Sequence, residues 1–163
     1  MLGSVGQEIV TDPGRLVAAR ANQHDVSNGE RALHQRNAPF WVIACGPLVH
    51  NAILAAAGLE KERVGVRVIN SPSVKPLDEA LILQSARETG ALVTVEEHQI
   101  NGGLGSAISE LVARNFPVPI EFIGVQNRFG GSGAPNELIE HFGMGVSHIA
   151  DAVRNVLTRK KSA

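Results

Sequence analysis

The chain has 163 residues, 44% of them hydrophobic and 19% charged, with a formal net charge of −1. This length and composition fit one globular domain with a sizeable core. The near-zero charge excludes a basic nucleic-acid-binding footprint, the apolar runs are too short to span a bilayer, and Cys45 as the only cysteine excludes an intrachain disulfide. We therefore expect a cytoplasmic protein with neither a nucleic-acid nor a membrane partner.

Residues 1–37 are expected to form an irregular lead or linker. They are rich in glycine, glutamine, asparagine and arginine and lack a sustained apolar period. One or two helical turns over 16–19 and a short edge strand at Leu33 remain alternatives, because such short apolar runs are ambiguous. The regular domain is therefore expected to comprise residues 38–163.

From residue 39 onward, apolar runs alternate with amphipathic segments. The continuous apolar runs predict strands over 40–45, 64–69, 91–95 and 120–125. Helical spacing predicts helices over 48–57 (with Gly58 as the stop), 78–87, 104–115, 135–142, and a last one with Ser147 as its N-cap. This alternation over short connections predicts a three-layer α/β/α fold around a mostly parallel, mixed sheet of five strands.

The strongest candidate site lies where the strand over 91–95 runs into Glu96, Glu97 and His98. Parallel α/β folds place their sites at this carboxyl edge of the sheet. In an extended chain Glu96 and His98 would share a side, opposite Glu97, and could act as acid and base. The alternative is that these side chains hold the loop together or pair across a subunit interface. The sequence does not separate the two interpretations.

A glycine turn follows, comprising Asn101, Gly102, Gly103, Gly105 and Ser106. It fits a dinucleotide fingerprint poorly, because Ile108 stands where a third glycine or alanine belongs and the turn follows the third strong strand. Two interpretations remain. The free N–H groups at the start of the next helix could bind an anion, or the glycines could permit a tight turn and close helix–sheet packing. We favour the tight turn.

The remaining candidates are isolated. Arg128, in a glycine-rich loop after the fourth strong strand, could clamp a phosphate or carboxylate, although a salt bridge within the loop is the favoured alternative. The six histidines show no paired spacing, so no metal site is predicted. Cys45 is expected to be a small buried hydrophobe, and His141 and His148 are expected at the surface.

From residues 39 to 157 the chain resembles the carboxyl-terminal domain of transketolases. Three ordered motifs carry the resemblance: Val68-Ile69-Asn70 with Lys75-Pro76-Leu77-Asp78; Thr94-Val95-Glu96-Glu97-His98 with Gly102-Gly103-Leu104-Gly105-Ser106; and Asn127-Arg128-Phe129-Gly130 with Ser132-Gly133 and Glu137-Leu138. Ser73-Val74 and His98 differ from the residues typical of deoxyxylulose phosphate synthases, and Gly-Gly-Leu-Gly differs from the Gly-Gly-Phe-Gly of 2-oxo-acid dehydrogenase beta subunits. Asn127 and Pro72 stand where the family usually has aspartate and histidine.

The resemblance implies part of an enzyme of pentose phosphate chemistry that transfers two-carbon ketol units between sugar phosphates. In that family, other domains hold the thiamine diphosphate and Mg²⁺, while the carboxyl-terminal domain packs in the dimer and against the catalytic domains. We therefore expect this chain to have no catalytic, cofactor or metal residues of its own. It would act in a homo- or hetero-oligomer with the subunit or domains that carry the thiamine diphosphate site.

On this interpretation the candidate residues form a turn or an interface at the carboxyl edge of the sheet: Glu96, Glu97, His98, Asn101, Gly102, Gly103, Gly105, Ser106 and Arg128. Two other hypotheses remain. The chain could be a free-standing regulatory or small-anion-binding module with the same fold, or a domain cut from a longer enzyme. The sequence alone leaves the sugar specificity open.

Overall fold

The computed structural model describes residues 7–12, 15–18 and 40–161, with side chains for 40–160. One six-stranded sheet runs in the order β2-β1-β4-β3-β5-β6. The strands are β1 (Gln7–Asp12), β2 (Arg15–Ala18), β3 (Phe40–Ala44), β4 (Val66–Asn70), β5 (Leu92–Gln99) and β6 (Ile120–Val125). The last four are parallel, whereas β1 is antiparallel to both β2 and β4. The mixed, mostly parallel sheet is confirmed, with six strands rather than five.

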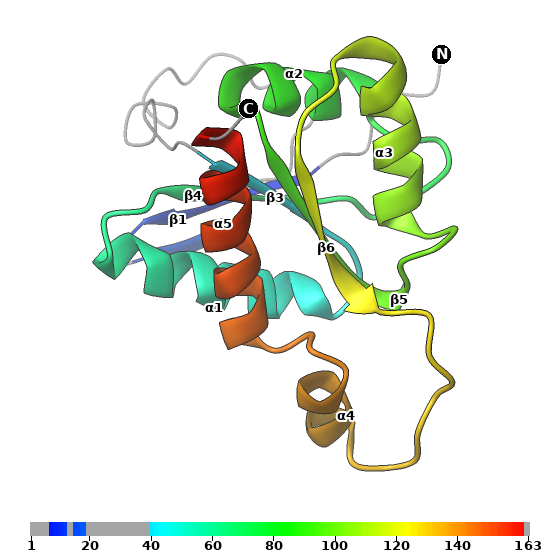
Figure 1. Cartoon of the computed structure of the whole chain (residues 1–163). Helices are drawn as coiled ribbons and strands as arrows, with labels where there is room; N and C mark the ends of the chain where they lie inside the picture. The colour runs from blue at the N-terminus through cyan, green and yellow to red at the C-terminus, as the bar shows by residue number, and fades with distance from the viewer. Residues whose placement is uncertain (1–6, 13–14, 19–39, 162–163) are drawn as a thin grey trace.

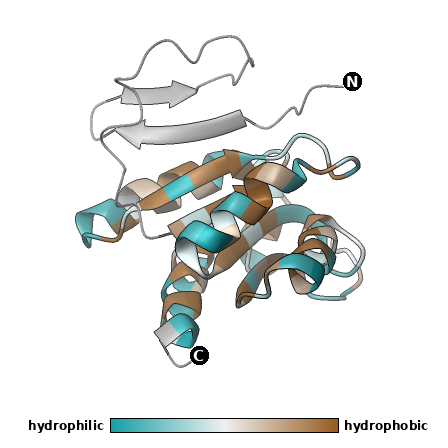
Figure 2. Ribbon diagram, turned by 90° about the horizontal axis from the view of Figure 1, so that it is seen from above, coloured by the Kyte–Doolittle hydropathy of each residue, from teal (hydrophilic) through white to brown (hydrophobic). Residues whose placement is uncertain are grey.

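Two pairs of helices cover the sheet and give three layers (Figure 1). Helices α1 (Leu48–Lys61) and α5 (Val146–Lys161) lie on one face, and α2 (Glu79–Thr89) and α3 (Leu104–Asn115) lie on the other. Every residue of β3 is buried, because successive side chains point to opposite faces and both faces are covered. Figure 2 shows the hydrophobic colouring concentrated on the strands and on the helix surfaces that face them.

Each face of the sheet has its own hydrophobic core. Phe40 and Val42 pack with residues of α1 and α5, such as Val153. Trp41 and Ile43 pack with residues of α2 and α3, such as Ile82, Leu104 and Ile108. The Arg67 guanidinium lies 5.0 Å from the centre of the Trp41 ring and makes a cation–π contact with it.

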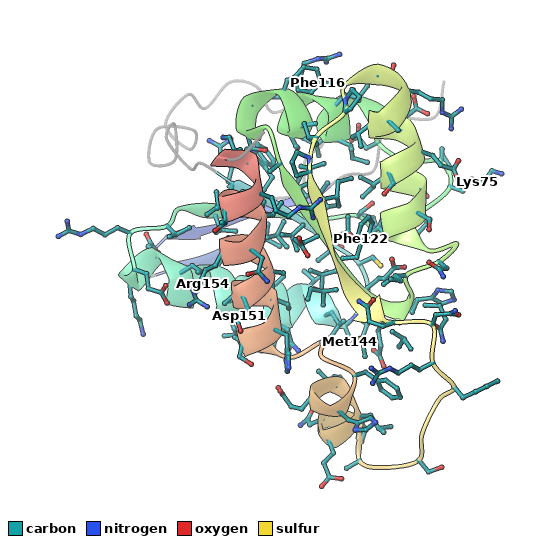
Figure 3. The ribbon with its side chains drawn as sticks, viewed as in Figure 1. Lys75, Phe116, Phe122, Met144, Asp151 and Arg154 are labelled. Carbon is teal, nitrogen blue, oxygen red and sulfur yellow. The ribbon has the colours of Figure 1, made fainter. Side chains whose placement is uncertain are left out.

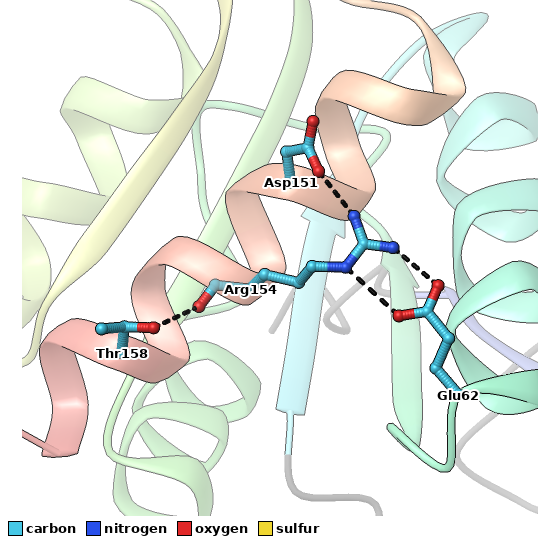
Figure 4. A network of polar contacts seen from close by, with 4 residues as sticks. All are labelled: Glu62, Asp151, Arg154 and Thr158. Carbon is cyan, nitrogen blue, oxygen red and sulfur yellow. Dashed lines mark hydrogen bonds and ion pairs between the residues drawn. The ribbon is translucent and has the colours of Figure 1, made fainter.

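An exposed network of ion pairs links the two helices of the first face (Figure 4). Arg154 of α5 donates from Nη2 to Glu62 Oε1 (2.7 Å) and from Nε to Glu62 Oε2 (3.2 Å), just beyond the end of α1. Its Nη1 also contacts Asp151 Oδ1 at 2.5 Å. The hydrogen bonds to Glu62 and then Asp151 raise the pKa of Arg154, and the bidentate contact joins α5 to the residue that follows α1.

The segment after β6 leaves the layered body. Residues 126–134 form a loop, and the short helix α4 (Pro135–His141) follows below the sheet in the view of Figure 1. No residue of α4 is buried, although Ile139 and Phe142 pack against the margin of the first core. This segment ends at Gly143, which has φ +72°, and the next residue, Met144, is buried in the core.

Several element boundaries differ from those expected. Helix α1 continues through Gly58 to Lys61, because a glycine inside a helix costs only about 1 kcal/mol and Leu59 beyond it is buried. Helix α5 begins at Val146, so Ser147 lies in its first turn and is not the N-cap. Helix α2 ends at Thr89, with Gly90 as its C-cap, and α4 ends at His141, with Phe142 as its C-cap. Both ends lie close to those expected.

The lead also differs in part. Residues 16–18 belong to strand β2 and not to a helical turn, because pairing with β1 supplies their backbone partners. Leu33 lies outside the described residues. Within the described part of the chain, no helix combines the length and apolarity that crossing a membrane requires.

Two glycine substitutions test these helix boundaries. Gly58→Ala should stabilise the chain by about 0.5–1 kcal/mol, because the residue is inside α1 and a Cβ there meets nothing within 4 Å. Gly90→Ala should destabilise it by about 1 kcal/mol, because Gly90 caps α2 at φ +64°. Urea unfolding measures both. Equal effects of the two substitutions would contradict the boundaries described here.

Candidate functional site

The centre of the candidate site is the carboxylate of Glu96, which is only 2% exposed. Its Oε2 accepts a hydrogen bond from the Leu104 N–H (2.7 Å), and its Oε1 accepts one from the Gly105 N–H (2.9 Å). These N–H groups begin α3, which has no cap from its own Gly103. A helix N-terminus has unpaired donors and a partial positive charge, and both favour an anion there. Glu96 is therefore an anion supplied by the chain itself.

The glycine turn is shaped by this contact. A Cβ on Gly103 would lie within 3 Å of the Glu96 carboxylate, and a Cβ on Gly105 would lie 2.6 Å from Phe122 and 2.8 Å from Thr94 Oγ1. Figure 3 shows Phe122 on β6 on the side of α3. Any side chain at these two positions would push α3 away from Glu96 and from the sheet. The tight-turn interpretation accounts for both glycines.

The rest of the turn closes on itself. The Gly102 N–H donates to Ser106 Oγ (2.8 Å), and this hydroxyl donates to the carbonyl of Ile100 (2.8 Å). Gly102 has φ +84°, a conformation that glycine adopts without a Cβ clash. Asn101 is exposed. The side chain of Ser106 is thus committed to holding the turn.

Strand β5 is irregular where Glu96 lies. Val95 pairs with Ile123, yet the next pair joins Gln99 to Val125, so β5 has extra residues that β6 does not match. Gly124 faces this bulge, because a Cβ there would lie 2.9 Å from the carbonyl oxygen of His98 and 3.2 Å from that of Glu96. The strand also extends to Gln99 and does not end at Val95 as expected.

The bulge separates the expected acid–base group. Glu96 is buried, whereas Glu97 and His98 are both exposed, so Glu96 and His98 do not share a side as regular alternation predicts. The ring nitrogen Nδ1 of His98 contacts the carbonyl oxygen of Gln99 at 3.0 Å. The structure therefore brings together Glu96, Gly103 and Gly105 and leaves the other two polar side chains on the surface.

Arg128 lies in the exposed loop after β6. Its backbone carbonyl accepts a hydrogen bond from Gln99 Nε2 at 2.6 Å, which ties the loop to the end of β5. Among residues 40–160 its guanidinium makes no ion pair, so the expected loop salt bridge is not found there. The sequence did not predict a role for Gln99 or Phe129. For Phe129, the feature that could have indicated an exposed contact residue is its position as an apolar residue in a glycine-rich polar loop.

Cys45 follows the last residue of β3, beside the candidate site. Its N–H donates to the carbonyl of Val95 (3.0 Å), and its side chain is half-buried rather than fully buried. Burial raises the pKa of the Cys45 thiol, and the negative charge of Glu96 raises it further. Because the thiolate is the reactive form, this cysteine is suited to packing and not to nucleophilic chemistry near neutral pH.

The residues at this edge of the sheet do not fit a metal–diphosphate cofactor. No group of three or more histidine, cysteine or acidic side chains that could hold a metal ion occurs in the part of the chain that the structure describes. The helix N-terminus that could receive a phosphate is taken by Glu96, whose carboxylate would repel one. We therefore derive no cofactor chemistry from these residues.

Comparison with known proteins identifies the fold and its motifs. The family described as "Transketolase, C-terminal domain" matches residues 29–149. The chain belongs to this family. It is 39% identical over 132 residues to the 6-deoxy-6-sulfo-D-fructose transketolase subunit SqwH of Clostridium sp. (strain MSTE9), and the aligned region covers 81% of this chain and 41% of that protein. It is 38% identical over 141 residues to the transketolase of Homo sapiens, and the aligned region covers 85% of this chain and 22% of that protein.

A solved structure agrees with this assignment. The structure named "Split gene transketolase, inactive beta4 tetramer" is similar with a TM-score of 0.71 and 40% sequence identity, over 74% of this chain and 40% of the other. The transketolase C-terminal domain described here therefore spans between about a fifth and two fifths of the length of these relatives.

The Glu96 contact can be tested with its neighbour as control. Glu96→Gln should destabilise the chain by about 2 kcal/mol or more, because it removes the charge and turns one of two acceptors into a donor facing an N–H group. Glu97→Gln, at an exposed position, should change the free energy of unfolding by less than about 0.5 kcal/mol. Urea unfolding compares them, and equal losses would show that Glu96 does not hold α3.

The thiol of Cys45 provides a pH test. Because its pKa is raised, the rate of alkylation should reach half its maximum at a higher pH in the folded chain than in the chain unfolded in urea. Iodoacetamide labelling followed by mass spectrometry across a pH series measures this. A midpoint in the folded chain at or below the unfolded one would contradict the described environment.

Proposed function

We propose that this chain is the carboxyl-terminal domain, or a split subunit, of a thiamine diphosphate-dependent transferase that moves two-carbon ketol units between sugar phosphates. Its role is to pack within the assembled enzyme and not to carry out the chemistry. We also propose a cytoplasmic location and a homo- or hetero-oligomeric enzyme, with the cofactor and Mg²⁺ held by the other domains.

The observation that carries this proposal is the occupied N-terminus of α3. A free-standing anion-binding module would use the carboxyl edge of the sheet and these backbone donors. Here the N–H groups of Leu104 and Gly105 each already donate a hydrogen bond to the Glu96 carboxylate. The family motif at this edge therefore serves the architecture of the domain, and this disfavours the anion-binding alternative.

The names of the relatives support the need for a partner. One is called a transketolase subunit, and the similar solved structure is called inactive. The chain spans 41% of the first and 22% of the human enzyme. We infer that the missing length carries the thiamine diphosphate site, and that this chain is inactive until it joins that part of the enzyme.

Calorimetry and reconstitution test the proposal. The isolated chain should give no heat of binding with thiamine diphosphate and Mg²⁺, because its described part has no metal ligand set and the two donors at the start of α3 are already paired with Glu96. Mixing it with the separately expressed thiamine diphosphate-binding polypeptide of the same enzyme should produce ketol transfer between sugar phosphates.

Each polypeptide alone is the control for that assay and should be inactive. Tight binding of thiamine diphosphate by the isolated chain would overturn the proposal. So would full activity of the cofactor-binding polypeptide without this chain.

A further inference from the structure

We propose that the loop of residues 126–134, through Phe129 and Arg128, docks this domain onto the polypeptide or domains that carry the thiamine diphosphate site. This inference rests on the proposed function and names the surface that it needs. Both residues are exposed, and they belong to the segment that leaves the layered body after β6 (Figure 1).

The exposure of Phe129 is the first observation. Its side chain is 101% exposed, whereas the other exposed large hydrophobic residues are only partly so: Leu54 (43%), Val74 (39%) and Phe116 (39%). Those three keep part of their surface on the body, as isolated surface apolar residues commonly do. The Phe129 side chain is not covered by any side chain of residues 40–160, although an aromatic ring gains much by burial.

The backbone that presents this ring is held in place. Gln99 Nε2 donates to the Arg128 carbonyl at 2.6 Å, and the Asn127 N–H donates to the Val125 carbonyl at 3.0 Å. At the far end of the loop, a Cβ on Gly133 would lie 3.3 Å from Leu138 of α4, so the loop returns closely against that helix. An anchored backbone with a free aromatic side chain loses little conformational freedom on binding.

The chemistry of the loop defines the surface that fits it. Arg128 has no ion pair within residues 40–160, and no acidic residue occurs between 126 and 136. Phenylalanine and arginine are enriched at the cores of protein interfaces. The complementary surface is therefore an apolar recess for Phe129 with a carboxylate near its rim for Arg128.

The length of the relatives indicates which protein surface binds this loop. This chain covers 41% of one relative and 22% of another, so most of such an enzyme must contact it from outside. A second copy of the chain is the competing occupant. A two-fold contact of the loop with itself would bring two Arg128 side chains together, and like charges in an interface oppose association.

A binding titration with a matched control tests this surface. The thiamine diphosphate-binding polypeptide of the same enzyme, expressed separately, is titrated with the wild-type chain and with Phe129→Ser and Phe116→Ser variants. Phe116 precedes β6 and Phe129 follows it, so the control lies at the other end of the strand (Figure 3). Phe129→Ser should raise the Kd about 30-fold or more, and Phe116→Ser should change it less than about 3-fold.

A folding control and three further outcomes complete the test. Phe129→Ser should melt within a degree or two of wild type, because its side chain is fully exposed, whereas Phe116→Ser should lower the Tm by a few degrees, because part of its ring is buried, and both should remain folded at the temperature of the titration. If the wild-type chain binds and Phe129→Ser binds equally well, the docking surface is wrong and the proposed function stands. If the wild-type chain does not bind, the proposed function fails and this inference with it. If Phe129→Ser alters only self-association in sedimentation, the occupant is a second copy and the proposal is overturned.

Discussion

The bond between the Glu96 carboxylate and the first N–H groups of α3 determines how the carboxyl edge of this sheet is built. A carboxylate that is almost fully buried is costly unless it is hydrogen-bonded, and here both oxygens accept backbone donors at 2.7 and 2.9 Å. The same pair of bonds satisfies donors that α3 would otherwise leave unpaired. Strand β5 and helix α3 are thus joined at the point where many parallel folds bind a ligand.

Other features of the edge follow from that bond. Gly103 leaves room for the carboxylate, and Gly105 lets the helix approach Phe122. The bulge in β5 lets Glu96 stay buried while Glu97 and His98 lie at the surface. Gln99, at the end of the bulge, then reaches the loop that carries Phe129. At the start of α3 the two donors that an anion would use are therefore already paired, and this edge is tied to the loop that carries Phe129.

The alternation of apolar runs and amphipathic segments was enough to predict the layers and the parallel strands, because burial on both faces leaves a strong pattern in strands such as Phe40–Ala44. The pattern could not reveal that α1 continues past Gly58, since the burial of Leu59 outweighs the local preference of glycine. Nor could regular alternation predict the bulge that separates Glu96 from His98. That separation arises in the pairing of β5 with β6, a strand that is distant in sequence. At Gly103 and Gly105 the tight-turn interpretation agrees with the close approach of α3 to the sheet, which leaves no room for a Cβ.

The central claim is that the chain's own carboxylate fills the anion position at α3. Nuclear magnetic resonance of the isotope-labelled chain, titrated with inorganic pyrophosphate, tests it at the two amides concerned. We predict that the Leu104 and Gly105 amide signals do not shift on titration of the wild-type chain, and that they shift in Glu96→Ala once both donors are free. Saturable shifts of these two amides in the wild-type chain would contradict the account.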